Sequence, residues 1–138
     1  MTLVMRAYLP DDFSGVDSLW TEAFPDDPLY NRAEIAIPAK LAVQPDLFLV
    51  AAEADEIVGT VMAGYDGHRG WLYAVAVRPF RRREAIGSML IHEAEERLKR
   101  LGCRKINLQI RSDNENVMHF YEALGYVGEA RVSMGKQV

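Results

Sequence analysis

The stretch that most constrains this chain is residues 75–90, where an apolar run passes through a basic turn into a helix-like pattern. The run ends at Pro79, and three consecutive arginines follow at positions 81–83. The first turn of a helix presents unpaired N–H groups and the positive end of the helix dipole, which together can hold an anion. Three small residues would let a phosphate approach the backbone: Ala85, Gly87 and Ser88. The pattern indicates a strand, a turn and a helix start able to bind phosphate, although a solvated surface turn has the same local composition.

The length and charge of the chain favour one domain, residues 1–138, without a general affinity for nucleic acid. Apolar residues make up 49% of the sequence, charged residues 26%, and the net charge is −4. The arginines of the turn are therefore a local basic cluster. No apolar run approaches the length of a membrane span and no signal-like start is present, so we expect a cytoplasmic protein with no membrane partner.

The sequence does not indicate a metal site, a disulfide or a reactive cysteine. Cys103 is the single cysteine, so no intramolecular disulfide can form, and its place at the start of an apolar segment favours a buried structural thiol. No spacing of histidines and carboxylates suggests a set of metal ligands. We expect no bound metal.

Apolar periodicity predicts an α/β (α+β) domain. Strands are expected at residues 3–7, 47–52, 57–65, 71–77 and 105–110, and helices at residues 13–23, 32–43, 86–101 and 117–124. The sheet is expected to be antiparallel up to residues 71–77, and residues 105–110 to lie parallel to that strand through a right-handed crossover. Residues 126–134 suggest one or two edge strands, through which a homodimer could form.

Two motifs coincide in order and spacing. The first is Val-Arg-Pro-Phe-Arg-Arg-Arg-Glu-Ala-Ile-Gly-Ser at residues 77–88, and the second places Tyr121 seven positions after Asn114. Together they resemble the GNAT superfamily of acyl-CoA-dependent N-acetyltransferases, whose acyl-CoA signature is Arg/Gln-x-x-Gly-x-Gly/Ala and whose final helix carries the second motif. Residues 64–70 and 133–136 also look like the small bacterial YpeA-type acetyltransferases. Ala85 departs from the signature, because it stands where glycine is usual and would be strained by a positive φ.

The resemblance implies a fold and a co-substrate site. The fold would be a mixed, mostly antiparallel central sheet of six to seven strands with splayed central strands, flanked by about four helices. Acetyl-CoA would be the co-substrate, with its pantetheine arm beside the splayed strand and its pyrophosphate held by backbone N–H groups. The residues that the resemblance assigns to this site are Val75, Ala76, Val77, Arg82, Arg83, Glu84, Ala85, Ile86, Gly87, Ser88 and Asn114.

The resemblance also implies a catalytic residue, Tyr121, opposite the departing thiolate. A phenol has a pKa of about 10 and a thiol about 8.5, so complete proton donation would be uphill by about 2 kcal/mol. We therefore expect a hydrogen bond to sulfur, with proton transfer partial or late. A backbone N–H near Val75 is the candidate donor to the carbonyl oxyanion.

A general base is not identified by the motifs. Some relatives carry a glutamate five residues before the motif asparagine, where this chain has Gln109, which cannot accept a proton at neutral pH. Four side chains stay open as alternatives, acting directly or through water: Glu53, Asp66, His68 and Tyr73.

The expected function is N-acetyl transfer from acetyl-CoA to a primary amine by direct attack in a ternary complex. Residues 24–43 and the loops near His68 and Met134 would build the acceptor side, and a small molecule, a peptide N-terminus and a lysine all stay open as acceptors. Asp26 and Asp27 could attract a cation or simply be solvated. The alternative is a non-catalytic acyl-CoA sensor or interaction module on the same fold; a nucleic-acid module is disfavoured by the net charge.

Overall fold

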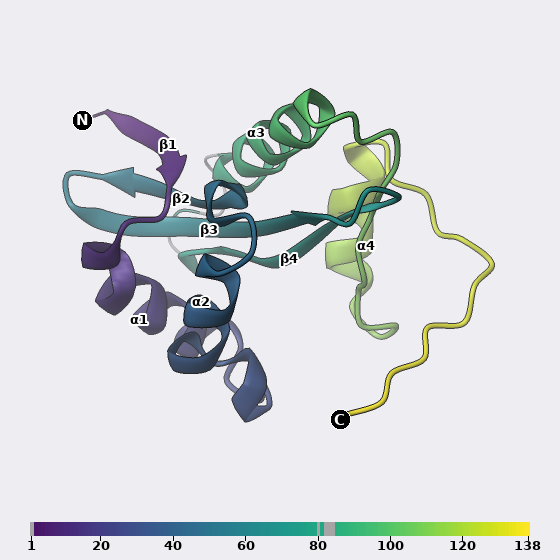
Figure 1. The fold of residues 1–138 in the computed structure, drawn as a ribbon, viewed down its shortest axis with the longest axis horizontal. Helices are drawn as coiled ribbons and strands as arrows, with labels where there is room; N and C mark the ends of the chain where they lie inside the picture. Colours follow the sequence, from purple (N-terminus) through teal and green to yellow (C-terminus); the bar gives the residue numbers. More distant parts are fainter. Residues whose placement is uncertain (1, 80, 82–84) are drawn as a thin grey trace. The chain divides into compact units, whose positions relative to one another are not determined.

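A central sheet with helices on both faces makes up most of the chain (Figure 1). The structure, a computed structural model, describes residues 2–79, 81 and 85–138. Two compact units divide the chain, Met1–Leu108 and Gln109–Val138. The first unit holds β1 (Leu3–Ala7), α1 (Phe13–Ala23), α2 (Ala33–Leu41), β2 (Phe48–Glu53), β3 (Glu56–Tyr65), β4 (Gly70–Val77), α3 (Ile86–Arg100) and β5 (Ile106–Asn107), with short 3₁₀ helices at Pro10–Asp12, Leu29–Asn31 and Pro45–Leu47. The second unit holds α4 (Glu115–Ala123).

The strands of the first unit follow one another in the sheet in chain order, β1-β2-β3-β4-β5. Neighbours from β1 to β4 are antiparallel, and β5 lies parallel to β4 after the crossover through α3, as the sequence predicted. Most predicted elements are observed within a few residues of their expected ends. Pro38 lies inside α2 and does not end it.

The predicted number of strands, six to seven, is wrong for the residues that the structure describes, which form five. Residues 126–138 contain no strand, although their apolar residues suggested one or two. Val127, Val132 and Met134 are more than four-fifths exposed, so the tail buries too little apolar surface to order a strand. The tail therefore has no strand edge of the expected kind, and a homodimer stays a prediction.

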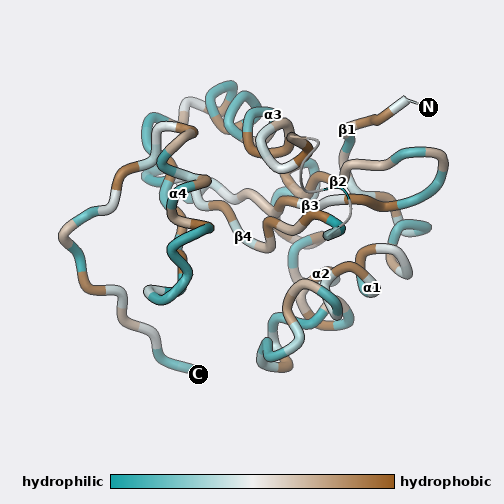
Figure 2. Tube along the Cα trace, turned by 180° about the vertical axis from the view of Figure 1, so that it is seen from behind, coloured by the Kyte–Doolittle hydropathy of each residue, from teal (hydrophilic) through white to brown (hydrophobic). Residues whose placement is uncertain are grey.

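Helices α1 and α2 cover one face of the sheet and α3 covers the other (Figure 1). On the first face, Tyr8 stacks on Phe48 with ring centroids 4.9 Å apart, and Trp20 packs against the same ring at 5.8 Å. On the second face, α3 buries a stripe at helical spacing and leaves its charged residues outside, which Figure 2 shows as alternating hydrophobic and hydrophilic segments. The stripe consists of Ile86, Leu90, Ile91, Ala94 and Leu98.

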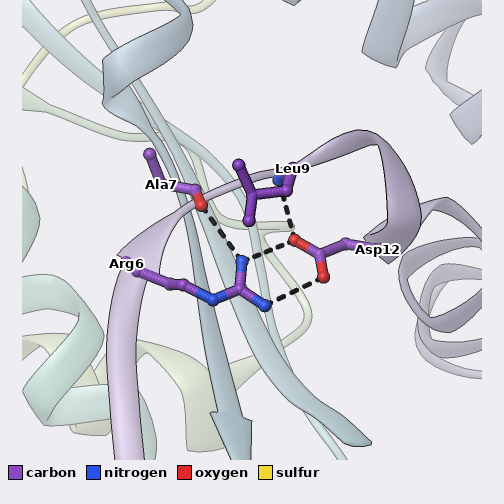
Figure 3. Close-up of polar contacts among 4 residues, drawn as sticks. All are labelled: Arg6, Ala7, Leu9 and Asp12. Atoms are coloured by element: carbon purple, nitrogen blue, oxygen red, sulfur yellow. Dashed lines mark hydrogen bonds and ion pairs between the residues drawn. The ribbon is translucent and has the colours of Figure 1, made fainter. Parts of the chain in front are cut away.

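A buried carboxylate fixes the connection between β1 and α1 (Figure 3). Asp12 is 7% exposed; its two oxygens accept from Arg6 Nη1 and Nη2 at 2.7 and 3.0 Å, and one of them also accepts from the Leu9 N–H at 2.8 Å. Burial alone would raise the pKa of Asp12, but these hydrogen bonds and the charge of Arg6 outweigh burial and lower the pKa. The pair sets where α1 begins, and thereby where Trp20 lies.

Candidate functional site

β4 carries a bulge in its middle. The register with β3 shifts between Thr60 and Met62, so that Ala74 and Val75 of β4 together lie opposite one residue of β3. Ala74 has a left-handed backbone, with φ of 49°, and its carbonyl oxygen accepts a hydrogen bond from Thr60 Oγ1 at 2.9 Å. The bulge re-aims the backbone at Val75, the position where the sequence suggested an oxyanion donor.

The carboxyl-terminal half of β4 runs on past its parallel neighbour. β5 pairs with β4 only at Gly70 and Trp71, so among the described strands β5 does not accompany β4 from Leu72 to Val77. Val75, Ala76 and Val77, which the sequence assigned to the co-substrate site, lie in this part of the strand. A strand edge of this kind can pair with an extended ligand through backbone groups.

The helix that follows β4 begins at a left-handed residue. Ala85 is the N-cap of α3 with φ of 60° and ψ of 18°, the conformation that the sequence identified as strained for alanine. Its carbonyl accepts from the Met89 N–H at 3.0 Å, the first helical bond. The N–H groups of Ile86, Gly87 and Ser88 therefore lie before any intrahelical acceptor. Arg82, Arg83 and Glu84, also assigned to this site, lie outside the described residues.

Arg81, the first arginine of the turn, is bound to β2. Its Nη1 and Nη2 each lie 3.0 Å from an oxygen of Glu53, and both side chains are mostly buried. The hydrogen bond from Arg81 is the main reason that the pKa of Glu53 is lowered. A carboxylate held in this way is a poor general base, so the structure weakens the case for Glu53.

Two of the other candidate bases, Asp66 and Tyr73, lie in or beside β4. Asp66 Oδ1 accepts from the N–H groups of His68 and Arg69, each at 2.7 Å, which lowers its pKa and closes the turn before β4. Tyr73 is 51% exposed, and its pKa is raised, chiefly by partial burial.

Tyr121 lies in the second unit, on α4. It is 7% exposed, and its ring meets Phe120 and Tyr126 edge to face, with centroids 5.0 and 5.7 Å away. Burial raises the pKa of Tyr121 to about 12. The phenol is therefore protonated at neutral pH and can act as a hydrogen-bond donor.

Asn114 caps α4. Its Oδ1 accepts from the Val117 N–H at 3.2 Å, and Gly125 follows the helix with φ of 97°. Gln109, which stands at the place of the glutamate found in some relatives, donates through Nε2 to the Ser133 hydroxyl. The capping contact gives Asn114 a structural role, and its assignment to the co-substrate stays a prediction.

A cavity of about 290 Å³ lies along α1 and the segment that leads into α2. It falls in the region that the sequence assigned to the acceptor. Trp20 and Phe24 supply apolar walls, and three carboxylates outnumber the one guanidinium on the lining: Asp17, Asp27, Glu34 and Arg32.

Sequence reasoning missed one polar side chain in the sheet, Thr60. It is fully buried, donates to the Ala74 carbonyl at the bulge, and accepts from Trp20 Nε1 at 2.9 Å. The available signal was a hydroxyl within the largely apolar stretch of residues 57–65, because a buried hydroxyl needs a partner.

Two kinds of structure are absent from residues 2–79, 81 and 85–138. In that part of the chain, no three side chains of histidine, cysteine, aspartate or glutamate gather closely enough to hold a metal ion. Among the helices described, none combines the length and apolar character needed to cross a bilayer.

Comparison with solved structures identifies the fold. Ard1 from Thermoplasma volcanium matches with a TM-score of 0.84 at 22% identity, over 94% of this chain and 86% of that protein. The aminoglycoside N-acetyltransferase AAC(6')-Iy, in a crystal structure with CoA, matches with a TM-score of 0.80 at 18% identity, over 99% of this chain and 95% of that protein. At these identities the likeness shows the fold alone.

Comparison of sequences gives the family. The model of the acetyltransferase (GNAT) family matches residues 6–126. Acetyltransferases of Sodalis glossinidius and Pectobacterium atrosepticum are both 42% identical to this chain, over 135 and 134 residues, covering 97% of this chain and 94% of each relative. With a family model and relatives that extend along nearly its whole length, this chain belongs to the GNAT family of acetyltransferases, enzymes whose co-substrate is acetyl-CoA.

Proposed function

We propose that this protein transfers an acetyl group from acetyl-CoA to a primary amine, by direct attack of the amine within a ternary complex. The observation that carries the proposal is the bulge of β4 at Ala74 and Val75, on a strand that runs on past β5 toward the start of α3. A re-aimed backbone N–H and an extended strand edge are what an acyl-transfer site needs from its scaffold.

The residues at the end of β4 and the start of α3 suit acetyl-CoA. Val75, Ala76 and Val77 would pair with the amides of the pantetheine arm as an added strand does. The N–H groups of the first turn of α3 would hold the pyrophosphate, because they precede any intrahelical acceptor and Ala85 has no side chain that could cap them. The assignments to Ile86, Gly87, Ser88 and the undescribed Arg82, Arg83 and Glu84 are part of this proposal.

Acyl transfer to an amine requires an oxyanion donor and a group that stabilises the departing sulfur. Acetyl-CoA supplies an activated thioester. We assign the oxyanion donor to the backbone N–H of Val75 and the donor toward sulfur to the hydroxyl of Tyr121.

The acidity of Tyr121 limits what it can do. With its pKa at about 12 and a thiol at about 8.5, complete proton transfer to the thiolate would be uphill by about 5 kcal/mol. The corresponding figure for an unperturbed phenol is about 2 kcal/mol, so burial makes a full proton transfer less favourable still. Tyr121 therefore acts as a hydrogen-bond donor to sulfur, with the proton moving late.

The cavity along α1 supports a cationic amine as acceptor. Carboxylates outnumber guanidinium groups on its lining, which raises the local concentration of ammonium ions. At about 290 Å³ it is near the lower end of small-molecule sites. A small amine or the end of one side chain fits that volume.

Release of free thiol from acetyl-CoA, measured across a panel of small amines, peptides and lysine-bearing substrates, tests the proposal. The wild-type protein should turn over at least one class of amine. Tyr121→Phe should lower kcat about 100-fold or more while leaving affinity for acetyl-CoA nearly unchanged. Tyr126→Phe is the matched control, since it removes a neighbouring phenolic hydroxyl and should leave kcat unchanged.

Calorimetry tests the pyrophosphate assignment separately. Gly87→Leu adds a side chain to the first turn of α3 and should weaken acetyl-CoA binding about tenfold or more, because phosphate must approach the backbone there. Gly128→Leu, whose added Cβ would meet no heavy atom within 4 Å, is the control. Tight binding without turnover of any amine would instead identify a non-catalytic acyl-CoA sensor.

A further inference from the structure

A chain of two hydrogen bonds, one buried and one partly buried, runs from α1 through β3 to the bulge of β4. Trp20 Nε1 lies 2.9 Å from Thr60 Oγ1, which lies 2.9 Å from the carbonyl oxygen of Ala74. Thr60 is fully buried and Trp20 is nearly so. Three elements distant in the sequence therefore meet at one hydroxyl.

The direction of each hydrogen bond follows from its chemistry. The indole N–H of Trp20 can only donate, and the carbonyl of Ala74 can only accept. The hydroxyl of Thr60 must therefore accept from the indole and donate to the carbonyl, which uses its single proton. The bond from the indole is buried and the bond to the carbonyl is partly buried, so losing a partner is costly.

The carbonyl of Ala74 and the N–H of Val75 belong to one planar peptide group. The described peptide bonds are all trans, so the two groups point in opposite directions across that plane. Because Thr60 holds the carbonyl toward the α1 side of β3, it also directs the N–H of Val75 away from Thr60. Ala74 is left-handed here, a conformation that alanine adopts only when its surroundings impose it.

We propose that Thr60, supported by Trp20, is a positioning residue that fixes the orientation of the peptide group between Ala74 and Val75, and so aims the Val75 N–H at the developing oxyanion. The inference rests on the proposed acetyl transfer and goes beyond it, since neither side chain touches a reacting atom in the proposed mechanism. The hydroxyl acts through the backbone.

A purely structural role for Thr60 makes a different prediction. A hydroxyl that only satisfied the Ala74 carbonyl would affect stability and not the rate of the folded enzyme. A positioning hydroxyl affects kcat while leaving acetyl-CoA affinity unchanged, because a donor aimed at the transition state contributes little to ground-state binding.

The test compares Thr60→Val, which keeps the shape and removes the donor, with Thr60→Ser, which keeps the donor. Removing an oxyanion donor outright lowers kcat about 100- to 1000-fold, so misaiming it should lower kcat about 10- to 100-fold in Thr60→Val. Thr60→Ser should recover kcat to within about threefold of wild type. Dissociation constants for acetyl-CoA should agree among all three proteins.

A second readout does not depend on activity. The amide ¹H–¹⁵N resonance of Val75 should shift in Thr60→Val and return toward its wild-type position in Thr60→Ser. Val58→Ala is the control for lost stability, because Val58 is fully buried on the same strand and makes no side-chain hydrogen bond to the bulge. It should leave the Val75 resonance and kcat nearly unchanged.

Two results would overturn the inference: a wild-type kcat in folded Thr60→Val, or an unshifted Val75 amide in that variant. If Thr60→Val does not fold, Thr60→Cys takes its place as a weak donor, and equal kcat values in the Ser, Cys and wild-type proteins would equally overturn it. Failure of the proposed function has a different signature, because the wild-type protein would then turn over no amine while the Val75 resonance still responded to Thr60.

Discussion

The two faces of β3 meet their helices in opposite ways at two adjacent residues. Gly59 faces α3, where an added Cβ would lie 2.8 Å from Leu90 Cδ1 and 3.1 Å from the Ala76 carbonyl oxygen. Thr60 faces α1, where its hydroxyl joins Trp20 to the β4 bulge. One face requires the absence of a side chain, and the other requires a hydroxyl.

The difference separates the two tasks of the site. Close packing at Gly59 fixes how near α3 approaches the sheet, and thereby where the N–H groups proposed for the pyrophosphate lie. The hydrogen bonds at Thr60 fix the backbone proposed for the oxyanion. Substitutions that disturb the α3 face should therefore weaken acetyl-CoA binding, and substitutions that disturb the α1 face should lower kcat.

The largest stability effect is expected from Gly59→Ala. The new methyl group meets a backbone carbonyl as well as the flexible end of Leu90, so the strand or α3 must shift, at a cost of about 1–3 kcal/mol in the free energy of unfolding. Urea denaturation measures this cost, and calorimetry should show weaker acetyl-CoA binding because the start of α3 moves.

Gly64→Ala is the matched control on the same strand. Its nearest neighbours would be Lys40 Nζ at 3.7 Å and Gln44 Oε1 at 3.9 Å, which are ordinary contacts. It should be neutral or stabilise slightly, because alanine loses less entropy than glycine on folding. Equal losses in both variants would mean that the α3 face does not depend on close approach at Gly59.

A smaller effect is expected on the other face from Asp12→Asn. Losing the charge of Asp12 weakens the hydrogen bonds from Arg6 and Leu9 that fix the start of α1. The cost should be about 1–2 kcal/mol at pH 7, toward the lower end of what hydrogen bonds to a charged group contribute, because Arg6 is partly exposed. Asp11→Asn, at an exposed neighbouring carboxylate, should change stability very little.

The pH dependence of that loss has a definite sign. The pKa of Asp12 is lower in the folded protein than its ordinary value of about 3.9. The unfolded chain therefore takes up the proton first, and the stabilisation is complete above about pH 5 and declines as the pH falls through the folded pKa. The difference in unfolding free energy between wild type and Asp12→Asn should shrink over the same interval. A difference that stayed constant down to pH 2 would show that the ion pair is not its source.

The sequence predicted most of the first unit because its elements are locally marked. The strand at residues 57–65 and the helix at residues 86–101 show their periods directly, and turn residues bound them. The tail was not predictable in this way, because apolar residues can form a strand only beside a partner strand. The same reason shortened the strand expected at residues 105–110 to Ile106–Asn107.

Around the candidate site, local backbone features were predictable from the sequence, and features made by tertiary contacts were not. The strain at Ala85 followed from the sequence, since it depends on local backbone chemistry. The bulge at Ala74 did not, because nothing distinguishes that alanine from the alanine two positions later. Its carbonyl is bound by Thr60, and Thr60 in turn has its partner on α1.

The smallest effect expected is a gain in stability at the start of α3, from Ala85→Gly. A left-handed alanine costs about 1–2 kcal/mol in the folded protein, and glycine would remove that cost. Glycine also has more freedom in the unfolded chain, which lowers stability by about 0.5–1 kcal/mol. The free energy of unfolding should therefore rise by about 0.5–1 kcal/mol. Ala39→Gly, on the exposed side of α2, is the control of opposite sign and should cost about 1 kcal/mol. Chemical denaturation measures the free energy of unfolding of both variants. Losses of similar size in the two would show that the backbone at Ala85 is not strained.

Acetyl-CoA affinity tests whether the left-handed residue at the start of α3 is already in its binding conformation. In that case the affinity of Ala85→Gly should stay at or slightly below the wild-type value while its stability rises. Such a result would separate the packing of α3 from the anion site at its start.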